Sequence, residues 1–162
     1  MNLPYCPVPV RWRHYYSLNY VMAACKSQHL ELIEEACAII ARRFKQDRHH
    51  LGAALRTRSG RLFTGVHLEA HVGRIAICAE AIAIGVAATA GDTEIEAIVA
   101  VDRKGRVVSP CGMCRELISD HSPDCEVIIP GDNGPEVVCV GDLLPRKYRK
   151  HTHSAPVDPP VR

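Results

Sequence analysis

The segment from Ala76 to Ala90, AICAEAIAIGVAATA, constrains the fold most strongly, because Glu80 is its only charged residue. We interpret this segment as a helix that ends at Gly91 and that, being apolar nearly all round, lies largely buried. A carboxylate in such surroundings is costly unless it has partners. The sequence therefore predicts a layered domain that covers this helix, and either partners or a chemical role for Glu80.

Hydrophobic periodicity on both sides of this segment predicts an α/β domain. An amphipathic helix is indicated by apolar residues at steps of three and four, namely Leu30, Ile33, Cys37, Ile40 and Phe44. GAALRT and LFTGVHL are predicted to be two strands of a hairpin that turns at residues 58–61. Further strands are predicted for EIEAIVAVD, the short RVVS, CEVIIP and EVVCVG. A third helix is predicted for CGMCRELISDH, with Pro110 at its start. The main elements run α-β-β-α-β-α-β-β, which is typical of one three-layer α/β domain.

Length and charge indicate a single folded unit with no strong electrostatic partner. The 162 residues suit one domain, and a formal net charge of +2 does not indicate electrostatic binding to nucleic acid or to a membrane surface. We predict an N-terminal extension over residues 1–26, poorly ordered, a folded domain over 27–148 and a disordered Pro-rich tail over 149–162. Met22 opens a stretch that resembles a natural start, so we expect residues 1–21 to be an extension or an upstream-start artefact.

The eight cysteines admit three explanations: a disulfide framework, a redox pair or metal ligands. The N-terminus contains no apolar segment of the kind found in export signals, so we expect a cytoplasmic protein. In that reducing compartment, cysteine pairs are more often metal-binding or catalytic than structural. The pair Cys111–Cys114, in SPCGMCRE, is therefore a candidate for metal ligation.

Cys78 and the Cys111–Cys114 pair stand at the starts of two predicted helices, where the helix dipole and free N–H groups favour a thiolate. Three converging thiolates form a zinc site with one open position, and an open position is typical of catalytic zinc. Glu80, two residues after Cys78, suits a general acid/base. A closed structural site would need a fourth ligand, Cys125 or Cys139, but both lie in apolar strands where we expect burial, and it would leave Glu80 without a purpose.

The segments CAE and PCGMC resemble the signature of zinc nucleobase deaminases, H/C-x-E followed by P-C-x-x-C. Over residues 27–148 the chain is similar to the small cytidine deaminases and their relative blasticidin-S deaminase. The resemblance implies a three-layer α-β-α cytidine deaminase-like fold with a central mixed five-stranded sheet and a catalytic domain over 27–148. It also implies one Zn²⁺ per chain, held by Cys78, Cys111 and Cys114, with Glu80 as the proton carrier.

The implied activity is hydrolytic deamination of a cytidine-like nucleoside to its uridine-like product with release of ammonia, as in pyrimidine salvage. The loop TGVHLEAHVGRIAICAE resembles the family's substrate loop, in which an Asn and a Glu hold the nucleoside. By that resemblance Glu69 and His67 bind substrate. The ending LLPRKY resembles the family's L-L-P-x-x-F, so Tyr148 is expected to reach the active site of a neighbouring subunit in a homotetramer.

Departures from the family pattern concern the substrate and the charge of the metal site. His67 replaces the Asn, and His49 stands where a Phe usually lies beside the sugar. The substrate therefore stays open between a cytidine-like nucleoside and another amino-heterocycle such as blasticidin S or a modified cytidine, with nucleic-acid editing less favoured. Ala81 replaces an Arg that often follows C-A-E, which makes Arg115 or Arg74 the candidate cation beside the thiolates.

Overall fold

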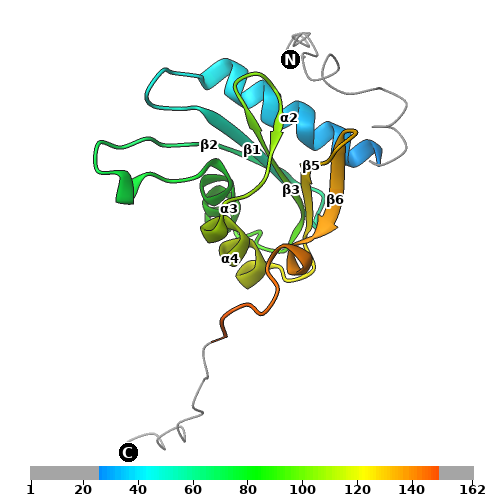
Figure 1. The fold of residues 1–162 in the computed structure, drawn as a ribbon. Coiled ribbons are helices and arrows are strands. Elements are labelled where there is room, and N and C mark those ends of the chain that lie inside the picture. The colour runs from blue at the N-terminus through cyan, green and yellow to red at the C-terminus, as the bar shows by residue number, and fades with distance from the viewer. Residues whose placement is uncertain (1–25, 150–162) are drawn as a thin grey trace, which may run out of the picture.

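The computed structural model describes residues 26–149 as one mixed sheet between helices (Figure 1). The predicted extension before residue 26 and the predicted tail after residue 149 lie outside the described residues. The helices are α2 (Ser27–Arg43), α3 (Ala79–Thr89) and α4 (Gly112–His121), with short 3₁₀ turns η2 (Gly73–Ile75) and η3 (Val140–Leu143). The strands are β1 (Leu51–Thr57), β2 (Leu62–Val66), β3 (Ile95–Asp102), β4 (Val107–Val108), β5 (Glu126–Pro130) and β6 (Pro135–Cys139).

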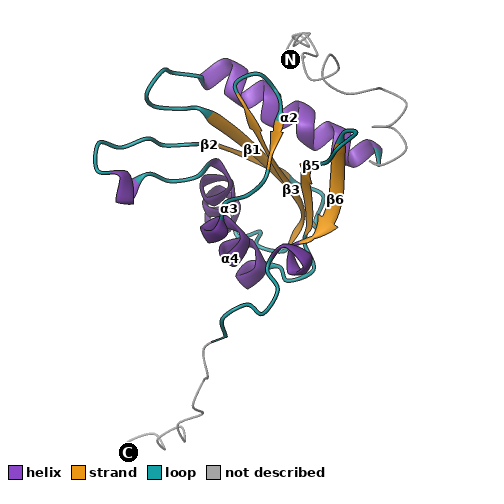
Figure 2. Ribbon diagram, viewed as in Figure 1, coloured by secondary structure: helices purple, strands orange, loops and turns teal. Residues whose placement is uncertain are grey.

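The sheet has the order β2-β1-β3-β5-β6, and β4 pairs with β3 beside this path. Only β3 and β5 run parallel; all other neighbouring strands are antiparallel, so the predicted mixed sheet is confirmed. The predicted number of five strands is one too low, because the two-residue strand β4 also pairs in the sheet. Helix α2 covers one face of the sheet, and α3 and α4 cover the other (Figure 2). None of the described helices is long and apolar enough to cross a membrane.

Two hydrophobic cores separate the three layers, and β3 contributes to both. Ile98 and Ala100 pack in the core under α3 and α4, whereas Val99 and Val101 pack in the core under α2. Successive side chains of a strand point to opposite faces of the sheet, so a central strand covered on both sides is apolar throughout. This double coverage explains why the centre of the strand, AIVAV over residues 97–101, is a continuous apolar run.

Helix α3 is shorter and less buried than the sequence predicts. It begins at Ala79, because Ile77 forms an antiparallel bridge with Leu68 and keeps residues 76–78 extended. Ala79, Glu80, Ala83, Ile84 and Ala87 are buried, but the opposite side of the helix is exposed. The prediction of nearly complete burial was wrong because the sheet covers only one side of this helix.

Gly65 of β2 fixes how closely α3 approaches the sheet. A Cβ atom at this position would lie 2.5 Å from both the carbonyl oxygen of Ala79 and the amide nitrogen of Ala83. Both atoms belong to the backbone of α3, so neither moves without displacing the helix. Cys78 directly precedes this helix, and the position of its thiol therefore depends on the glycine.

We expect Gly65→Ala to lower the free energy of unfolding by about 1–3 kcal/mol, the usual cost of overpacking a well-packed core. The matched control is Gly73→Ala in the exposed turn η2, where an added Cβ meets no atom within 4 Å. Replacing glycine with alanine at a compatible position restricts the unfolded chain and stabilises by about 0.4–1 kcal/mol, so the control is expected to be neutral or stabilising. Urea denaturation of both variants measures the difference, and equal stabilities would contradict the close-approach argument.

Candidate functional site

Three cysteine thiols meet where α3 and α4 begin. Cys78 is the N-cap residue of α3, Cys111 is the N-cap residue of α4, and Cys114 lies in the first turn of α4. Their Sγ atoms all lie within 4.8 Å of one another, and those of Cys78 and Cys111 are 3.5 Å apart. The structure thus brings together the three cysteines that the sequence predicts as ligands, although they come from segments 33 residues apart.

The donor set fits a zinc ion. Zn–S bonds of about 2.3 Å in a tetrahedral site separate the sulfur atoms by about 3.8 Å, close to the spacing of Cys78 and Cys111. Burial raises the pKa of the Cys78 thiol and, together with the charge of Glu80, that of Cys114. Burial also opposes ionisation of Cys111, but the backbone of Cys114 and the Cys78 thiol outweigh it and lower this pKa. Three thiols so arranged ionise together only beside a cation, which supplies the missing positive charge.

No fourth ligand completes this group among residues 26–149. No further histidine, cysteine or carboxylate of that range lies within 4.8 Å of all three thiols. Cys125 is buried, as predicted, whereas Cys139 is exposed, which contradicts the prediction because the last residue of β6 lies at the end of the sheet. The arrangement therefore offers three protein ligands and leaves room for a fourth from solvent or substrate, as catalytic zinc sites do.

Glu80 is buried beside the thiols, with only 5% of its surface exposed. Its position in the first turn of α3 follows directly from that of Cys78, and it interacts with Cys114. Burial raises the pKa of the Glu80 carboxyl. A carboxyl group whose pKa is closer to neutral exchanges protons more readily at physiological pH, which is what a general acid/base requires.

The loop after β2 lies beside the thiols because of the bridge between Leu68 and Ile77. Two backbone hydrogen bonds of 2.9 Å join these residues and align residues 67–69 with 76–78. The amide of Glu69 also donates to the carbonyl oxygen of Arg48. His67 and Glu69, both predicted substrate contacts, therefore lie next to the segment that carries Cys78.

Two further histidines join His67 and Glu69. The His50 ring stacks on the His67 ring with centroids 5.6 Å apart, and Nδ1 of His49 lies 2.8 Å from the carbonyl oxygen of His67. Burial lowers the pKa of the His67 imidazole, against the attraction of Glu69. Sequence reasoning considered His49 but missed His50, although the His49–His50 doublet directly before β1 was a usable signal.

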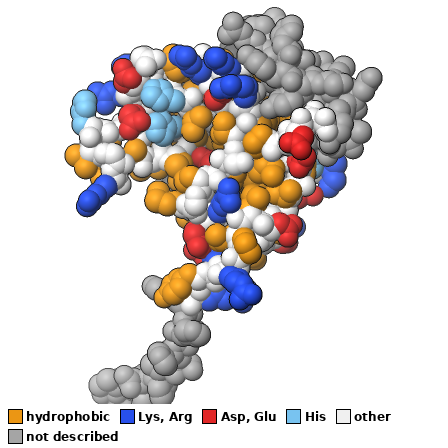
Figure 3. All heavy atoms as spheres, viewed as in Figure 1, with side chains coloured by type: hydrophobic (Ala, Val, Ile, Leu, Met, Phe, Trp, Pro, Cys, Tyr) orange, Lys and Arg blue, Asp and Glu red, His pale blue; other side chains and the backbone are white. Residues whose placement is uncertain are grey.

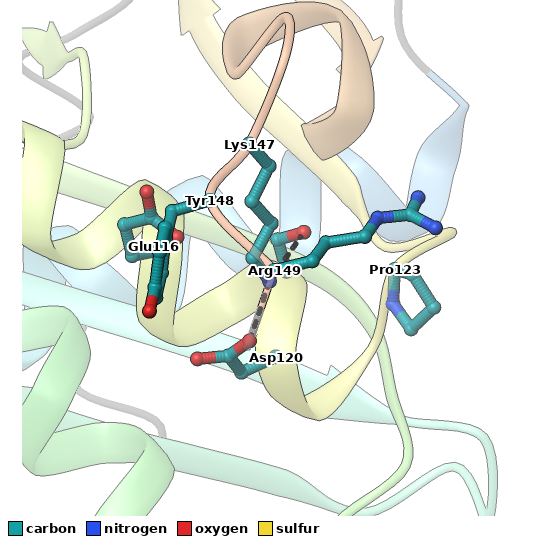
Figure 4. A pocket seen from close by; sticks show the side chains of 7 residues that line it. Glu116, Asp120, Pro123, Lys147, Tyr148 and Arg149 are labelled. Carbon is teal, nitrogen blue, oxygen red and sulfur yellow. Dashed lines mark hydrogen bonds and ion pairs between the residues drawn. The ribbon is translucent and has the colours of Figure 1, made fainter. Parts of the chain in front are cut away.

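Tyr148 lies apart from this group in its own chain. It is 76% exposed and lines a shallow surface pocket along α4, where Figure 4 shows it next to Glu116. In the same pocket the Lys147 ammonium donates to Ser119 and pairs with Asp120. Nothing in this pocket connects Tyr148 with the thiols of the same subunit.

The two candidate cations occupy different places. The Arg115 guanidinium donates from Nε to the carbonyl oxygen of Pro110 and from Nη1 to that of Leu143. It therefore ties the residue before Cys111 to the end of η3. Arg74 lines an apolar pocket that includes Cys78 and Met113. Arg115 is positioned to hold the segment that carries Cys111, and Arg74 approaches the site from the loop.

Comparisons with known proteins agree with this geometry. Residues 26–129 match a family model described as the cytidine and deoxycytidylate deaminase zinc-binding region. The chain is 46% identical over 132 residues to a blasticidin-S deaminase of Bacillus cereus, an alignment covering 76% of this chain and 94% of that protein. It is 33% identical over 101 residues to a cytidine deaminase of Mycobacterium tuberculosis, covering 62% and 74%. The crystal structure of the Burkholderia pseudomallei cytidine deaminase superposes with a TM-score of 0.63 at 33% identity, covering 74% of this chain and 98% of that one.

Proposed function

We propose that this chain hydrolyses the C–N bond to the amino group of a cytidine-like nucleoside and releases the uridine-like product and ammonia. The chain belongs to the cytidine and deoxycytidylate deaminase family. It is an aminohydrolase, acting on a C–N bond as its relatives do. The observation that carries the proposal is the placement of a buried Glu80 beside three converging thiols, which have no fourth ligand among residues 26–149. We assign one Zn²⁺ per chain to Cys78, Cys111 and Cys114.

When bound, zinc would act as a Lewis acid that lowers the pKa of water in the open position toward about 7. Glu80 accepts a proton from the attacking water and delivers it to the ring nitrogen beside the amine-bearing carbon. The water oxygen bonds to that carbon, and Glu80 takes the second proton from the hydroxyl group so formed. Glu80 passes this proton to the amine, the C–N bond breaks, and ammonia leaves a carbonyl group on the ring. The burial that raises the pKa of Glu80 also excludes bulk water from these transfers.

The loop beside the thiols would bind the rest of the substrate. Glu69 accepts hydrogen bonds from substrate hydroxyl or amino groups, and His67 contributes one donor or one acceptor according to its tautomer. Tyr148 would act on a neighbouring subunit, which is consistent with its exposure and with a pocket that includes none of the three thiols. A place in cytoplasmic pyrimidine salvage remains a prediction from the family resemblance.

Ammonia release from a panel of substrates tests the proposed function. Purified protein with its zinc content measured is incubated with cytidine, deoxycytidine, blasticidin S and an aminopurine. Release from a cytidine-like compound, abolished by chelating the metal, is the expected result. No ammonia from any member of the panel, with one zinc present per chain, would refute the proposal.

Blasticidin S belongs in this panel because the chain aligns with nearly the whole of a blasticidin-S deaminase. A much higher kcat/KM on blasticidin S than on cytidine would reassign the substrate and leave hydrolytic deamination intact. The residues that decide between them would be those in which the loop departs from the cytidine enzymes, above all His67.

A homotetramer would cover the apolar surface that a single chain exposes around the thiols. Val86 on α3 is 45% exposed and Met113 on α4 is 71% exposed. The outer side of α3 forms an open apolar hollow with Ile82, Gly85 and Val86. We expect Val86→Glu to shift the mass in sedimentation from four chains to fewer, whereas Lys104→Glu, in an exposed turn, leaves it unchanged. A wild-type protein that sediments as a single chain at micromolar concentration would overturn this assignment.

A further inference from the structure

A second group of metal-ligand side chains lies outside the thiol site. His50, His67 and Glu69 each offer one ligand atom, and these atoms lie within 4.8 Å of one another. They come from two loops, the one that enters β1 and the one that leaves β2, and these loops are joined by the hydrogen bond from the Glu69 amide to the Arg48 carbonyl oxygen. Figure 3 shows histidine side chains next to an acidic side chain on the part of the surface where these loops lie in Figure 1.

We propose that His50, His67 and Glu69 form a second binding site for a divalent transition metal such as Zn²⁺. Two imidazoles and one carboxylate are a ligand set that zinc uses with a fourth, open position. Imidazole is a good ligand for zinc, copper and nickel and a poor one for magnesium and calcium, so the site selects transition metals.

The geometry requires only a modest closure of the two loops. His67 Nε2 and Glu69 Oε2 are 3.8 Å apart, whereas ligands at about 2.0–2.2 Å from a tetrahedral zinc are about 3.4 Å apart. The His50 and His67 rings are inclined by 29°, so a small rotation can direct both rings at one ion. Oε1 of Glu69 accepts the Ala70 amide N–H, and Oε2 of the partly exposed carboxylate faces His67 and can bind the ion without breaking that hydrogen bond.

The hydrogen bonds of the rings allow this binding at a small cost. Nδ1 of His67 is buried with no hydrogen-bond partner among the described residues, so no hydrogen bond has to break when Nε2, which faces Glu69, binds a metal. His50 Nε2 accepts the amide N–H of Asp47, a residue with a positive φ of 59°. A metal on His50 competes with this one bond. The second site is therefore weaker than the thiol site, because it must break a hydrogen bond and contains no thiolate.

Occupation of this site would have a functional consequence. His67 and Glu69 are also the side chains assigned to the substrate, so a metal bound by them excludes it. Excess Zn²⁺ is thus expected to inhibit competitively, raising KM and leaving kcat unchanged. This consequence depends on the proposed function, whereas the metal binding itself does not.

Counting bound Zn²⁺ tests the site without reference to turnover. Full-length protein is dialysed against increasing free Zn²⁺, and the wild-type chain is expected to bind one equivalent more than His50→Gln. Glutamine keeps an acceptor for the Asp47 amide but is a poor zinc ligand. Glu69→Gln is expected to lose the same equivalent, and His121→Gln, at the exposed end of α4, to keep it. Equal counts in wild type, His50→Gln and Glu69→Gln would overturn the proposal.

Cobalt distinguishes the two sites by their ligands. The first equivalent of Co²⁺ is expected to bind the thiols and to give intense thiolate-to-metal charge-transfer absorption. The second equivalent is expected to add only weak d–d bands, and His50→Gln is expected not to bind it. A further equivalent that increases the thiolate absorption would mean a second ion at the cysteines and would refute the site. If the protein deaminates normally but binds no second equivalent of metal, only this inference is refuted. Lack of deamination with only the thiol site loaded, in a protein that binds the second equivalent at higher free Zn²⁺, refutes only the proposed function.

Discussion

Replacing Glu80 with glutamine is expected to lower kcat by about 10³–10⁴-fold while the protein keeps its fold and one zinc per chain. The carboxyl group is proposed to carry two protons in each turnover, and a single positioned acid/base group contributes about 10²–10⁴-fold. Glutamine has nearly the same volume and fits the same buried position, but it cannot exchange a proton. KM is expected to change little, because the substrate contacts assigned to Glu69 and His67 remain.

The matched control is Glu94→Gln, which removes an exposed carboxylate that lies just before β3. It is expected to keep full turnover. Ammonia release and zinc content are measured on all three proteins, together with urea denaturation. A Glu80→Gln protein that retained more than a tenth of the wild-type kcat would remove Glu80 from the mechanism. A variant that lost its zinc would instead assign Glu80 to the metal site.

The sequence predicts the order of the elements and the ligand cluster because both depend on local patterns. A central strand such as β3 has to be apolar where both of its faces are covered, over residues 97–101, and a hairpin such as 57–62 needs a residue like Gly60, whose φ is +86°. The same holds for Cys78 and Cys111, each of which directly precedes a helix start. Their convergence requires α3 and α4 to lie on the same face of the sheet, which no local pattern shows, so it was expected from the resemblance to the zinc deaminase signature.

Features that depend on pairing between distant segments escaped prediction. The bridge between Leu68 and Ile77 shortens α3 at its start and brings the loop after β2 to the thiols, yet neither residue carries a signal for it. The stacking of His50 on His67 is of the same kind, because it needs two loops to fold toward each other. The two-residue strand β4 was identified as a short strand but left out of the sheet, since its partner could not be known.

Replacing Cys111 with serine is expected to weaken zinc binding by about 10²–10³-fold. Zinc sites built from protein ligands bind with about 10–16 kcal/mol, so one ligand of four accounts for about 2.5–4 kcal/mol. Serine is nearly isosteric with cysteine but is a poor ligand because its hydroxyl stays protonated. Cys111 is exposed, so the substitution leaves the core of the domain intact. Turnover at limiting zinc is expected to fall with the loss of bound metal.

The effect on stability follows from the same change in affinity. A ligand that binds only the folded chain stabilises it by RT ln(1 + [L]/Kd), so a 10²–10³-fold weaker site loses about 2.7–4.1 kcal/mol at saturating zinc. Chelating the metal should therefore destabilise the wild-type protein by about 2.7–4.1 kcal/mol more than it destabilises Cys111→Ser. Cys139→Ser is the matched control, because it replaces another exposed thiol at the end of β6, and it should behave as wild type. If both serine variants kept zinc and the same thermal midpoint, Cys111 would not be a ligand, and two thiols alone could not hold the ion that the mechanism requires.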